Sequence, residues 1–499
     1  MKTPTKKQIK FSAKELLALL KKSFDDFVKE SPIYYDEHSL WWAWDDEKKF
    51  WSIVDDVCVL NLFEDFFDLK TEQVSKHSGF ILKVLRQKSR RYKPLDLPEY
   101  CVQFKNKIYN LREKKELPAT PKYFLTAPIP YELSKNSETP TIDRLFVEWV
   151  GEKYKPTLYE ILAYSCLREQ FLQTIVALTG AGSNGKGTFQ NLIIKFLGKE
   201  NCVASNIKSL ITRSFETSAL YKKLLCVVGE VDSADLTNTN LLKQLTGEDL
   251  IRYEFKGKTT FSELSPTTFI IATNSLPITP DKSDGFYRRI LTIDFPNQFK
   301  LKRDLLAEIP EKEFHNLTRK VVDVLLRLIE TNEFTNGGDI EERRRRYEER
   351  SNPLMMFVSQ DYEEGGAGYV KLREFSNSFN DFLKQKKLRQ LTVSKIGKLL
   401  RDEGFEVSTR KFKDETGEII DSAKSIIGLT EKSQEKTKKI ESHRIVETGG
   451  LGGSETTRTT ESGYTPQDKI FCIKCKSNNV HAYSDMIFCD DCKHKEQLK

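Results

Sequence analysis

The sequence GAGSNGKGT occupies residues 180–188, between an apolar segment at 174–178 and a helical pattern. The apolar residues of that pattern recur every three or four positions: Phe189, Leu192, Ile193, Phe196 and Leu197. This order of strand, glycine-rich loop and helix is typical of a phosphate-binding loop, because glycines let backbone N–H groups converge on an anion and the helix N-terminus adds a partial positive charge. The stretch therefore predicts an α/β sheet domain with a phosphate site, with a chance glycine-rich turn as the alternative.

Within this loop, Lys186 would place a full positive charge beside the phosphates. The residues expected to hold the nucleotide are Gly180, Gly182, Asn184, Gly185, Lys186, Gly187 and Thr188. Gly187 stands where a Ser or Thr that ligates Mg²⁺ usually follows the lysine, so Thr188 is our candidate for that role.

Two further apolar segments end in polar side chains. Residues 224–232 predict a buried strand that leads to Glu230 and Asp232, carboxylates that can hold Mg²⁺ and polarise an attacking water. Gly229 replaces the acid that commonly precedes this glutamate, and the alternative is a strand that simply reaches solvent. Residues 267–274 predict a strand that ends in Asn274, whose amide can orient water, although a turn residue would look the same.

The same region also contains basic residues that could contact DNA or a nucleotide. Residues 252–261 predict a hairpin with Gly257 at its tip and Lys256 and Lys258 beside it, placed to grip a DNA phosphate. Arg288 and Arg289 precede another strand and could complete the site of a neighbouring subunit. Exposed lysines at hairpin tips and surface salt bridges are the ordinary alternatives.

In this order the loop, acid strand, hairpin, asparagine and arginine pair resemble the superfamily 3 helicases, especially the phage, plasmid and poxvirus primase-helicase family. The stretches 243–249 and 287–289 are also similar to that family. The resemblance covers residues 30–430. It implies an AAA+-like ATPase that forms a hexameric ring and moves along one DNA strand. By motif, Lys186 would bind phosphate, Glu230 would serve catalysis, Asn274 would sense the γ-phosphate and Arg289 would act in trans, with Arg288 beside it.

The pattern along the chain predicts a multidomain protein with a P-loop motor. The expected regions are a mainly helical N-terminal accessory region at 1–150, an ATPase domain at 151–335, a helix plus winged helix at 336–430, a flexible linker at 431–466 and a zinc ribbon at 467–499. Residues 1–150 are few for a primase and contain no Asp-x-Asp pair, so a separate primase or polymerase is expected as a partner. The tryptophan-rich stretch 41–51 predicts a hairpin, packed or used for base stacking. Residues 339–364 predict a solvated helix with i,i+4 ion pairs, and a nucleic-acid contact is the alternative.

Residues 369–428 carry two amphipathic helical patterns and then a strand pattern, the order of a winged helix. Val393, Ile396, Leu399 and Leu400 are expected to face inward. Lys395, Lys398 and Arg401 then fall on the opposite face, which suits DNA binding, although a solvated basic face is the competing interpretation.

Four cysteines near the C-terminus have the spacing of a zinc ribbon. They are Cys472, Cys475, Cys489 and Cys492. Two Cys-x-x-Cys turns complete a tetrahedron around Zn²⁺, and because all four ligands come from the protein the metal would be structural. Free cysteines or disulfides are the alternative.

Composition restricts the class only weakly. A net charge of +7 and a pI near 8.7 are compatible with nucleic acid but not diagnostic. No signal peptide or membrane-length apolar run is evident, so we expect a cytoplasmic protein of a host cell or a virus-encoded intracellular one. The leading hypothesis is an ATP- and Mg²⁺-dependent replicative helicase of a mobile element, acting on single-stranded and forked DNA. The alternatives are an origin-binding initiator whose ATPase switches assembly and a small-molecule kinase.

Overall fold

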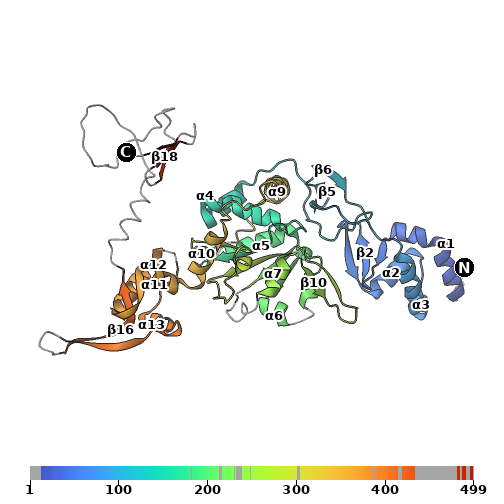
Figure 1. Ribbon diagram of the computed structural model, residues 1–499. Helices are drawn as coiled ribbons and strands as arrows, with labels where there is room; N and C mark the ends of the chain where they lie inside the picture. Colours follow the sequence, from blue (N-terminus) through green and yellow to red (C-terminus); the bar gives the residue numbers. More distant parts are fainter. Residues whose placement is uncertain are drawn as a thin grey trace. The chain divides into compact units, whose positions relative to one another are not determined.

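The computed structural model describes residues 13–180, 182–212, 216–229, 231, 239–247, 249–299, 304–385, 388–413 and 419–432, and three short strands nearer the C-terminus. The chain divides into two units, Met1–Lys432 and Ser433–Lys499, and each is described by itself (Figure 1).

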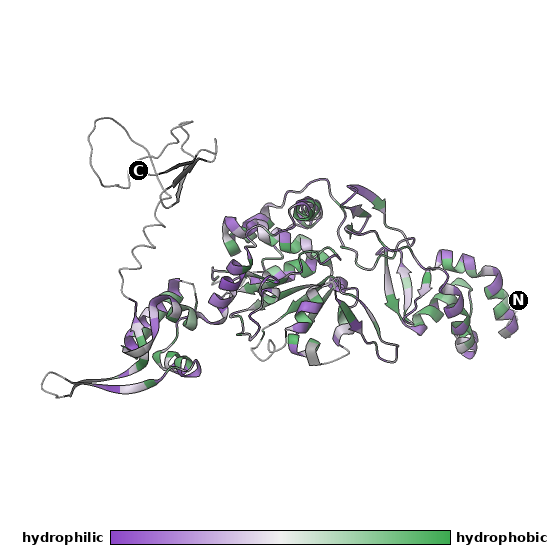
Figure 2. Ribbon diagram, viewed as in Figure 1, coloured by the Kyte–Doolittle hydropathy of each residue, from purple (hydrophilic) through white to green (hydrophobic). Residues whose placement is uncertain are grey.

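A five-stranded parallel sheet forms the centre of the first unit, in the order β13-β7-β12-β9-β8. Its strands are β7 (Ile175–Thr179), β8 (Cys202–Ser205), β9 (Leu225–Val228), β12 (Thr268–Thr273) and β13 (Ile290–Asp294). Every residue of β7 is buried, because helices cover both faces of a parallel sheet. The sheet is correspondingly hydrophobic in Figure 2. The predicted multidomain α/β fold is confirmed at this level.

The helices divide between the two faces of the sheet. One face packs against α4 (Pro140–Tyr164), α5 (Lys186–Leu197) and α9 (Glu311–Thr331). The other packs against α6 (Ile207–Thr212), α7 (Asn240–Thr246), α8 (Asp284–Tyr287) and α10 (Ile340–Ser351). The short helices η1 (Lys199–Asn201) and η2 (Glu216–Leu220) and the hairpin of β10 (Leu250–Tyr253) and β11 (Phe261–Leu264) complete this part.

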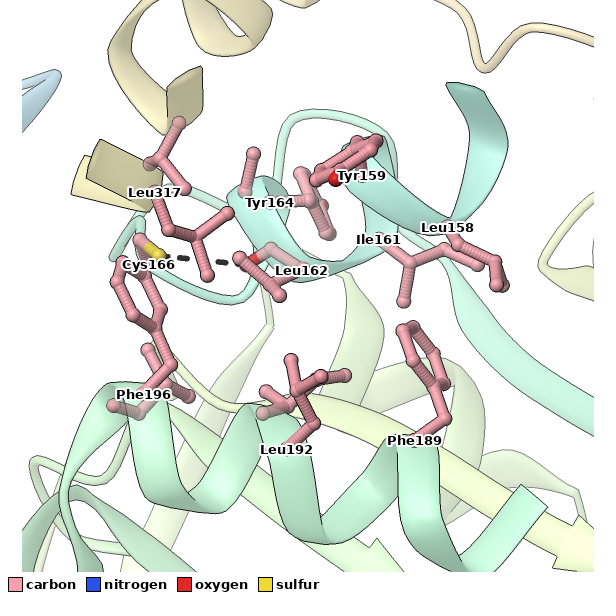
Figure 3. Close-up of a cluster of buried hydrophobic side chains, with 14 of the residues drawn as sticks. Leu158, Tyr159, Ile161, Leu162, Tyr164, Cys166, Phe189, Leu192, Phe196 and Leu317 are labelled. Carbon is pink, nitrogen blue, oxygen red and sulfur yellow. Dashed lines mark hydrogen bonds between the residues drawn. The ribbon is translucent and has the colours of Figure 1, made fainter. Parts of the chain in front are cut away.

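Helices α4 and α9 pack against helix α5. Figure 3 shows Phe189, Leu192 and Phe196 of α5 pointing toward Leu162 of α4 and Leu317 of α9, all of them fully buried. Burying a large apolar side chain contributes about 1.5–3 kcal/mol, so this layer fixes the helix firmly. The first turn of α5, which follows the glycine-rich loop, is thereby fixed as well.

The N-terminal region contains long helices and two small antiparallel sheets. The helices are α1 (Ala13–Glu30), α2 (Asp56–Phe66) and α3 (Thr71–Ser89). The sheets are β1 (Ile33–Tyr35), β2 (Trp41–Asp45) and β3 (Phe50–Val54), then β4 (Cys101–Gln103), β5 (Lys107–Asn110) and β6 (Lys115–Pro118). The tryptophan hairpin forms as predicted, and Trp41, Trp42 and Trp51 are buried in it, which favours the packing role over base stacking.

A module of two helices and a β-ribbon follows α10 and α11 (Pro353–Asp361). It contains β14 (Tyr362–Lys371), α12 (Leu372–Gln385), α13 (Val393–Asp402), β15 (Val407–Lys413) and β16 (Ile419–Glu431), with the strand order β14-β16-β15. Thr392 caps α13, accepting a hydrogen bond from the backbone N–H of Lys395. Ile396 and Leu400 are buried as expected, whereas Val393 is 41% exposed, so the prediction that it faces inward is wrong.

The second unit contains a three-stranded antiparallel sheet of β17 (Val480–Tyr483), β18 (Met486–Cys489) and β19 (Lys495–Gln497). Cys489 ends β18, while Cys472, Cys475 and Cys492 lie outside the described residues. Among the described residues there is no group of three or more His, Cys, Asp or Glu side chains that could hold a metal. Within the same part of the chain, no helix has the length and apolar character that crossing a membrane requires.

Candidate functional site

The glycine-rich loop lies at the carboxyl end of the parallel sheet, at a point where the connections of two neighbouring strands turn to opposite faces. Strands β7 and β12 are neighbours, and the chain leaves β7 through α5 on one face of the sheet but leaves β12 toward α8 on the other face. In parallel α/β sheets, ligands bind at the carboxyl ends of such a pair of strands. The loop that follows Thr179 and the segment that follows Thr273 both lie at this edge.

Glycine is required at two positions of the loop. Gly180 and Gly185 have φ angles of +152° and +94°, which L side chains rarely adopt. A Cβ at Gly180 would lie 1.9 Å from Asn184 Nδ2, and one at Gly185 would lie 2.6 Å from the Trp149 ring. The backbone therefore passes too close to its neighbours for any larger residue.

Lys186 begins α5 and its side chain is buried at the centre of the loop. Its Nζ donates to the Gly180 carbonyl at 2.7 Å, to Asn184 Oδ1 at 3.0 Å and to Asn274 Oδ1 at 3.5 Å. Asn184 is itself fixed, because its Nδ2 donates to the Phe295 carbonyl at 3.0 Å. The structure thus brings Lys186 and Asn274, two predicted site residues, into one cluster at the carboxyl end of the sheet.

The remaining predicted loop residues surround this cluster. Gly182 has a φ of +95°, and its N–H bonds to the Gly180 carbonyl at 3.0 Å. Gly187 is exposed and Thr188 is half-buried in the first turn of α5. Strand β9 lies next to β12 and ends at Val228, while Glu230 and Asp232 lie outside the described residues.

A carboxylate that the sequence analysis did not single out lies beside the loop. Asp294 ends β13, accepts a hydrogen bond from the Thr179 hydroxyl and forms an ion pair with Arg350 of α10 at 2.6 Å. These contacts tie the end of β7 to α10. No local signal indicates them, because Asp294 and Arg350 are 56 residues apart.

Helix α10 differs from the solvated helix that was expected. The ion pairs Arg346–Glu342 and Arg345–Glu349 form at the predicted i,i+4 spacing. The helix is nevertheless docked along β13, with Arg350 at the carboxyl end of the strand and Arg343 donating to the Arg288 carbonyl near its amino end.

Arg288 and Arg289 lie at the other end of the strands, the amino end of the sheet. They precede Ile290, the first residue of β13, whereas Asp294, its last residue, lies beside the loop. At about 3.3 Å per residue the strand alone separates them from the loop by roughly 13 Å. Arg288 is exposed and Arg289 half-buried. Burial and the neighbouring Arg288 lower the pKa of Arg289, while Asp249 opposes this shift. The chain therefore does not bring its own arginine pair to its own loop.

The hairpin of β10 and β11 presents the two predicted lysines. Gly257 has a φ of +73°, and Lys256 and Lys258 on either side of it are exposed. At its base Phe255 stacks on Phe261 with an interplanar angle of 8°, and His38 stacks on Phe261 at 3.7 Å.

Helix α13 presents the other predicted basic residues. Lys395, Lys398 and Arg401 are exposed on it, opposite the buried Ile396 and Leu400.

Fold and site together define a multidomain α/β protein with a glycine-rich loop at the carboxyl end of a parallel sheet. Residues 178–289, which include the loop, Asn274 and both arginines, match a family of unknown function (DUF5906). No curated protein matches the chain. Among solved structures, the A form apo structure of the NrS-1 C-terminal region is 11% identical and covers 85% of this chain and 100% of its own, with a TM-score of 0.43. A second apo structure of that region (305-718) is 13% identical and covers 83% and 98%, also at 0.43. These TM-scores are too low to establish a shared fold for the whole chain.

Proposed function

We propose that the chain is an ATP-dependent DNA helicase with an AAA+-like motor, as its resemblance to superfamily 3 implies. The observation that carries this proposal is the meeting of Lys186 and Asn274 at the carboxyl ends of β7 and β12. The Lys186 ammonium can exchange its hydrogen bonds to the Gly180, Asn184 and Asn274 oxygens for bonds to the oxygens of a polyphosphate, which are stronger acceptors because they are charged.

Each residue of the site has a role in this proposal. Lys186 and the backbone N–H groups of the loop hold the phosphates, and Asn274 orients the attacking water. Glu230 activates that water. Thr188 and Asp232 are oxygen ligands of the kind that Mg²⁺ prefers, and Thr188 lies in the same helical turn as Lys186. Bound Mg²⁺ would neutralise charge on the phosphates.

The arginine pair and the hairpin extend this proposal to an assembly on DNA. Because Arg288 and Arg289 lie at the far edge of the sheet from Lys186, they can serve a nucleotide only on another subunit, which favours a ring, and the resemblance implies a hexamer. Lys256 and Lys258 would then grip single-stranded DNA in the channel. A separate primase or polymerase would act at the same fork.

The C-terminal modules are proposed as accessory DNA-binding parts. The order and packing of α12, α13 and the β-ribbon support a winged helix, with Lys395, Lys398 and Arg401 facing duplex DNA. The four cysteines of the tail, Cys472, Cys475, Cys489 and Cys492, would hold a structural Zn²⁺.

Strand displacement from a forked DNA substrate tests the proposal. The wild-type protein should unwind the fork only with ATP and Mg²⁺, and Lys186→Ala should lose unwinding and hydrolysis while still binding DNA. Lys199→Ala, an exposed lysine just beyond α5, is the matched control and should behave as wild type. Unwinding by Lys186→Ala at the wild-type rate would refute the site.

The exposed basic face of α13 favours a second candidate, an origin-binding initiator whose ATPase switches assembly. Such a protein would hydrolyse ATP and bind specific duplex DNA tightly, yet displace no long strand in the same assay.

A further inference from the structure

Gln173 contacts both arginines of the pair. It precedes β7, and its Oε1 accepts hydrogen bonds from Arg288 Nη2 at 3.0 Å and from Arg289 Nη2 at 3.1 Å. Arg289 also donates through Nη1 to the Gly285 carbonyl at 2.7 Å, and the backbone N–H of Ile175 donates to the Arg289 carbonyl at 2.6 Å. One amide oxygen therefore holds two guanidinium groups side by side.

The pair lacks the close carboxylate that neighbouring arginines have, although Asp249 lies near enough to Arg289 to act on its pKa. Arg344, Arg345, Arg346 and Arg350 of α10 each form an ion pair with a carboxylate. Within the described part of the chain, neither Arg288 nor Arg289 is within ion-pair distance of a carboxylate. Two adjacent cations whose shared hydrogen-bond acceptor is a neutral amide form a site that an anion would complete.

The backbone at Gln173 is held in an uncommon conformation. Its φ is +47°, in the left-handed region, and its N–H bonds to the Gln170 carbonyl at 2.9 Å. A non-glycine residue persists there only when its surroundings hold it. The turn directs the side chain to the arginines at the start of the strand.

Space for a ligand adjoins Gln173 and Arg288. A pocket of about 290 Å³ is lined by Gln173, Arg288 and Arg343, among others. Glu333 and Asp339 also line it, but neither is within ion-pair distance of Arg288 or Arg289, and Asp339 caps α10 by accepting from the backbone N–H of Glu342.

We propose that Gln173 is a positioning residue that holds Arg288 and Arg289 together as a two-pronged site for the terminal phosphate of a nucleotide bound to a neighbouring subunit. This inference rests on the proposed ATPase function. A neutral amide suits the task, because it orients both guanidinium groups without cancelling the charge that the phosphate needs. A carboxylate at the same position would orient them equally well but would compete with the phosphate.

Mixing variants distinguishes this role from a merely structural one. Gln173→Ala should lower kcat for ATP hydrolysis roughly 100-fold, the cost of misplacing a catalytic group by about 1 Å, and leave KM unchanged. Mixed with Lys186→Ala, whose arginines are intact, it should regain hydrolysis, because its own loop then faces a correct arginine pair. Mixed with Arg289→Ala it should regain none.

The variant Gln173→Glu provides a second test of the positioning role. Its two new ion pairs should keep the melting temperature at or above that of wild type, yet kcat should fall at least as far as in Gln173→Ala. Gln170→Ala, which removes an amide that contacts Thr268 instead of the arginines, is the matched control and should retain wild-type kcat.

Wild-type kcat in Gln173→Ala, or failure of folded Gln173→Ala to be rescued by Lys186→Ala, would overturn the inference. The proposed function fails by a different result, which is normal hydrolysis by Lys186→Ala alone. If Lys186→Ala and Arg289→Ala are both inactive and Gln173→Ala is fully active, only the positioning role is lost.

Discussion

At the scale of single residues, the space around Gly185 determines how closely the loop can wrap. Its φ of +94° and the Trp149 ring at 2.6 Å from any added Cβ leave room for hydrogen only. Gly187, two residues later, has nothing within 4 Å of an added Cβ and an ordinary φ. The two glycines of one loop therefore have different physical requirements.

This difference gives a paired prediction. Gly185→Ala should lower the free energy of unfolding by about 1–3 kcal/mol and abolish nucleotide binding, because the strained φ and the clash with Trp149 displace the loop. Gly187→Ala keeps its backbone N–H and should bind nucleotide normally. Thermal unfolding with and without Mg-ATP measures both effects, and equal behaviour of the two variants would contradict the assigned geometry.

Residue identities predicted part of this site. The glycines and Lys186 stand out because one short stretch contains strand, loop and helix signals together. The proximity of Lys186 to Asn274, 88 residues away, was implied only by the resemblance. Gln173 and Asp294 could not be found at all, because a lone Gln or Asp before or after a strand looks like any surface residue.

At the scale of elements, the β10–β11 hairpin is anchored at its base and exposed at its tip. Phe261 stacks with both Phe255 and His38, while Lys256 and Lys258 are exposed around Gly257. A hairpin with a fixed base and a basic tip is suited to contacting DNA phosphates with its lysines.

Replacing both Lys256 and Lys258 with alanine should uncouple hydrolysis from unwinding. ATP turnover should persist, since the hairpin tip has no part in the loop, while strand displacement should fall to background because the phosphate contact is lost. The matched control replaces Lys114 and Lys115, exposed lysines of the β5–β6 hairpin. Unwinding at the wild-type rate by the Lys256 and Lys258 variant would rule out the hairpin as the DNA contact.

The sequence predicts where helices and strands begin and end better than it predicts how they pack against one another. Thr392 predicted the start of α13, because a capping hydroxyl acts within one turn. The charge pattern of α10 predicted its i,i+4 ion pairs for the same reason. The packing of α10 along β13 depends on partners such as Asp294 that are distant in sequence. The local spacing of residues in α10 therefore could not predict this packing.

At the scale of the whole molecule, the chain divides into the units Met1–Lys432 and Ser433–Lys499, and the proposed nucleotide-binding residues all belong to the first. A structural metal in the second should therefore matter little to hydrolysis.

Removal of zinc tests whether ATP hydrolysis is independent of the metal in the second unit. A zinc-selective chelator should release one Zn²⁺ per chain and increase proteolysis of the tail, because a short module with few apolar residues depends on its metal. ATP hydrolysis should change less than about twofold, because distant sites without shared partners usually couple by no more than about 0.5 kcal/mol. Mutation of Cys472 and Cys475 to serine should reproduce the chelated state, and undiminished zinc content in that variant would refute the ligand assignment.

Direct measurement of nucleotide affinity tests the central claim most simply. Titration calorimetry with Mg-ATP should give saturable binding to the wild-type chain with a dissociation constant below about 1 mM, and Lys186→Ala should show none. Absence of binding by the folded wild-type protein, or equal binding by the variant, would contradict the assignment of the loop as a phosphate site.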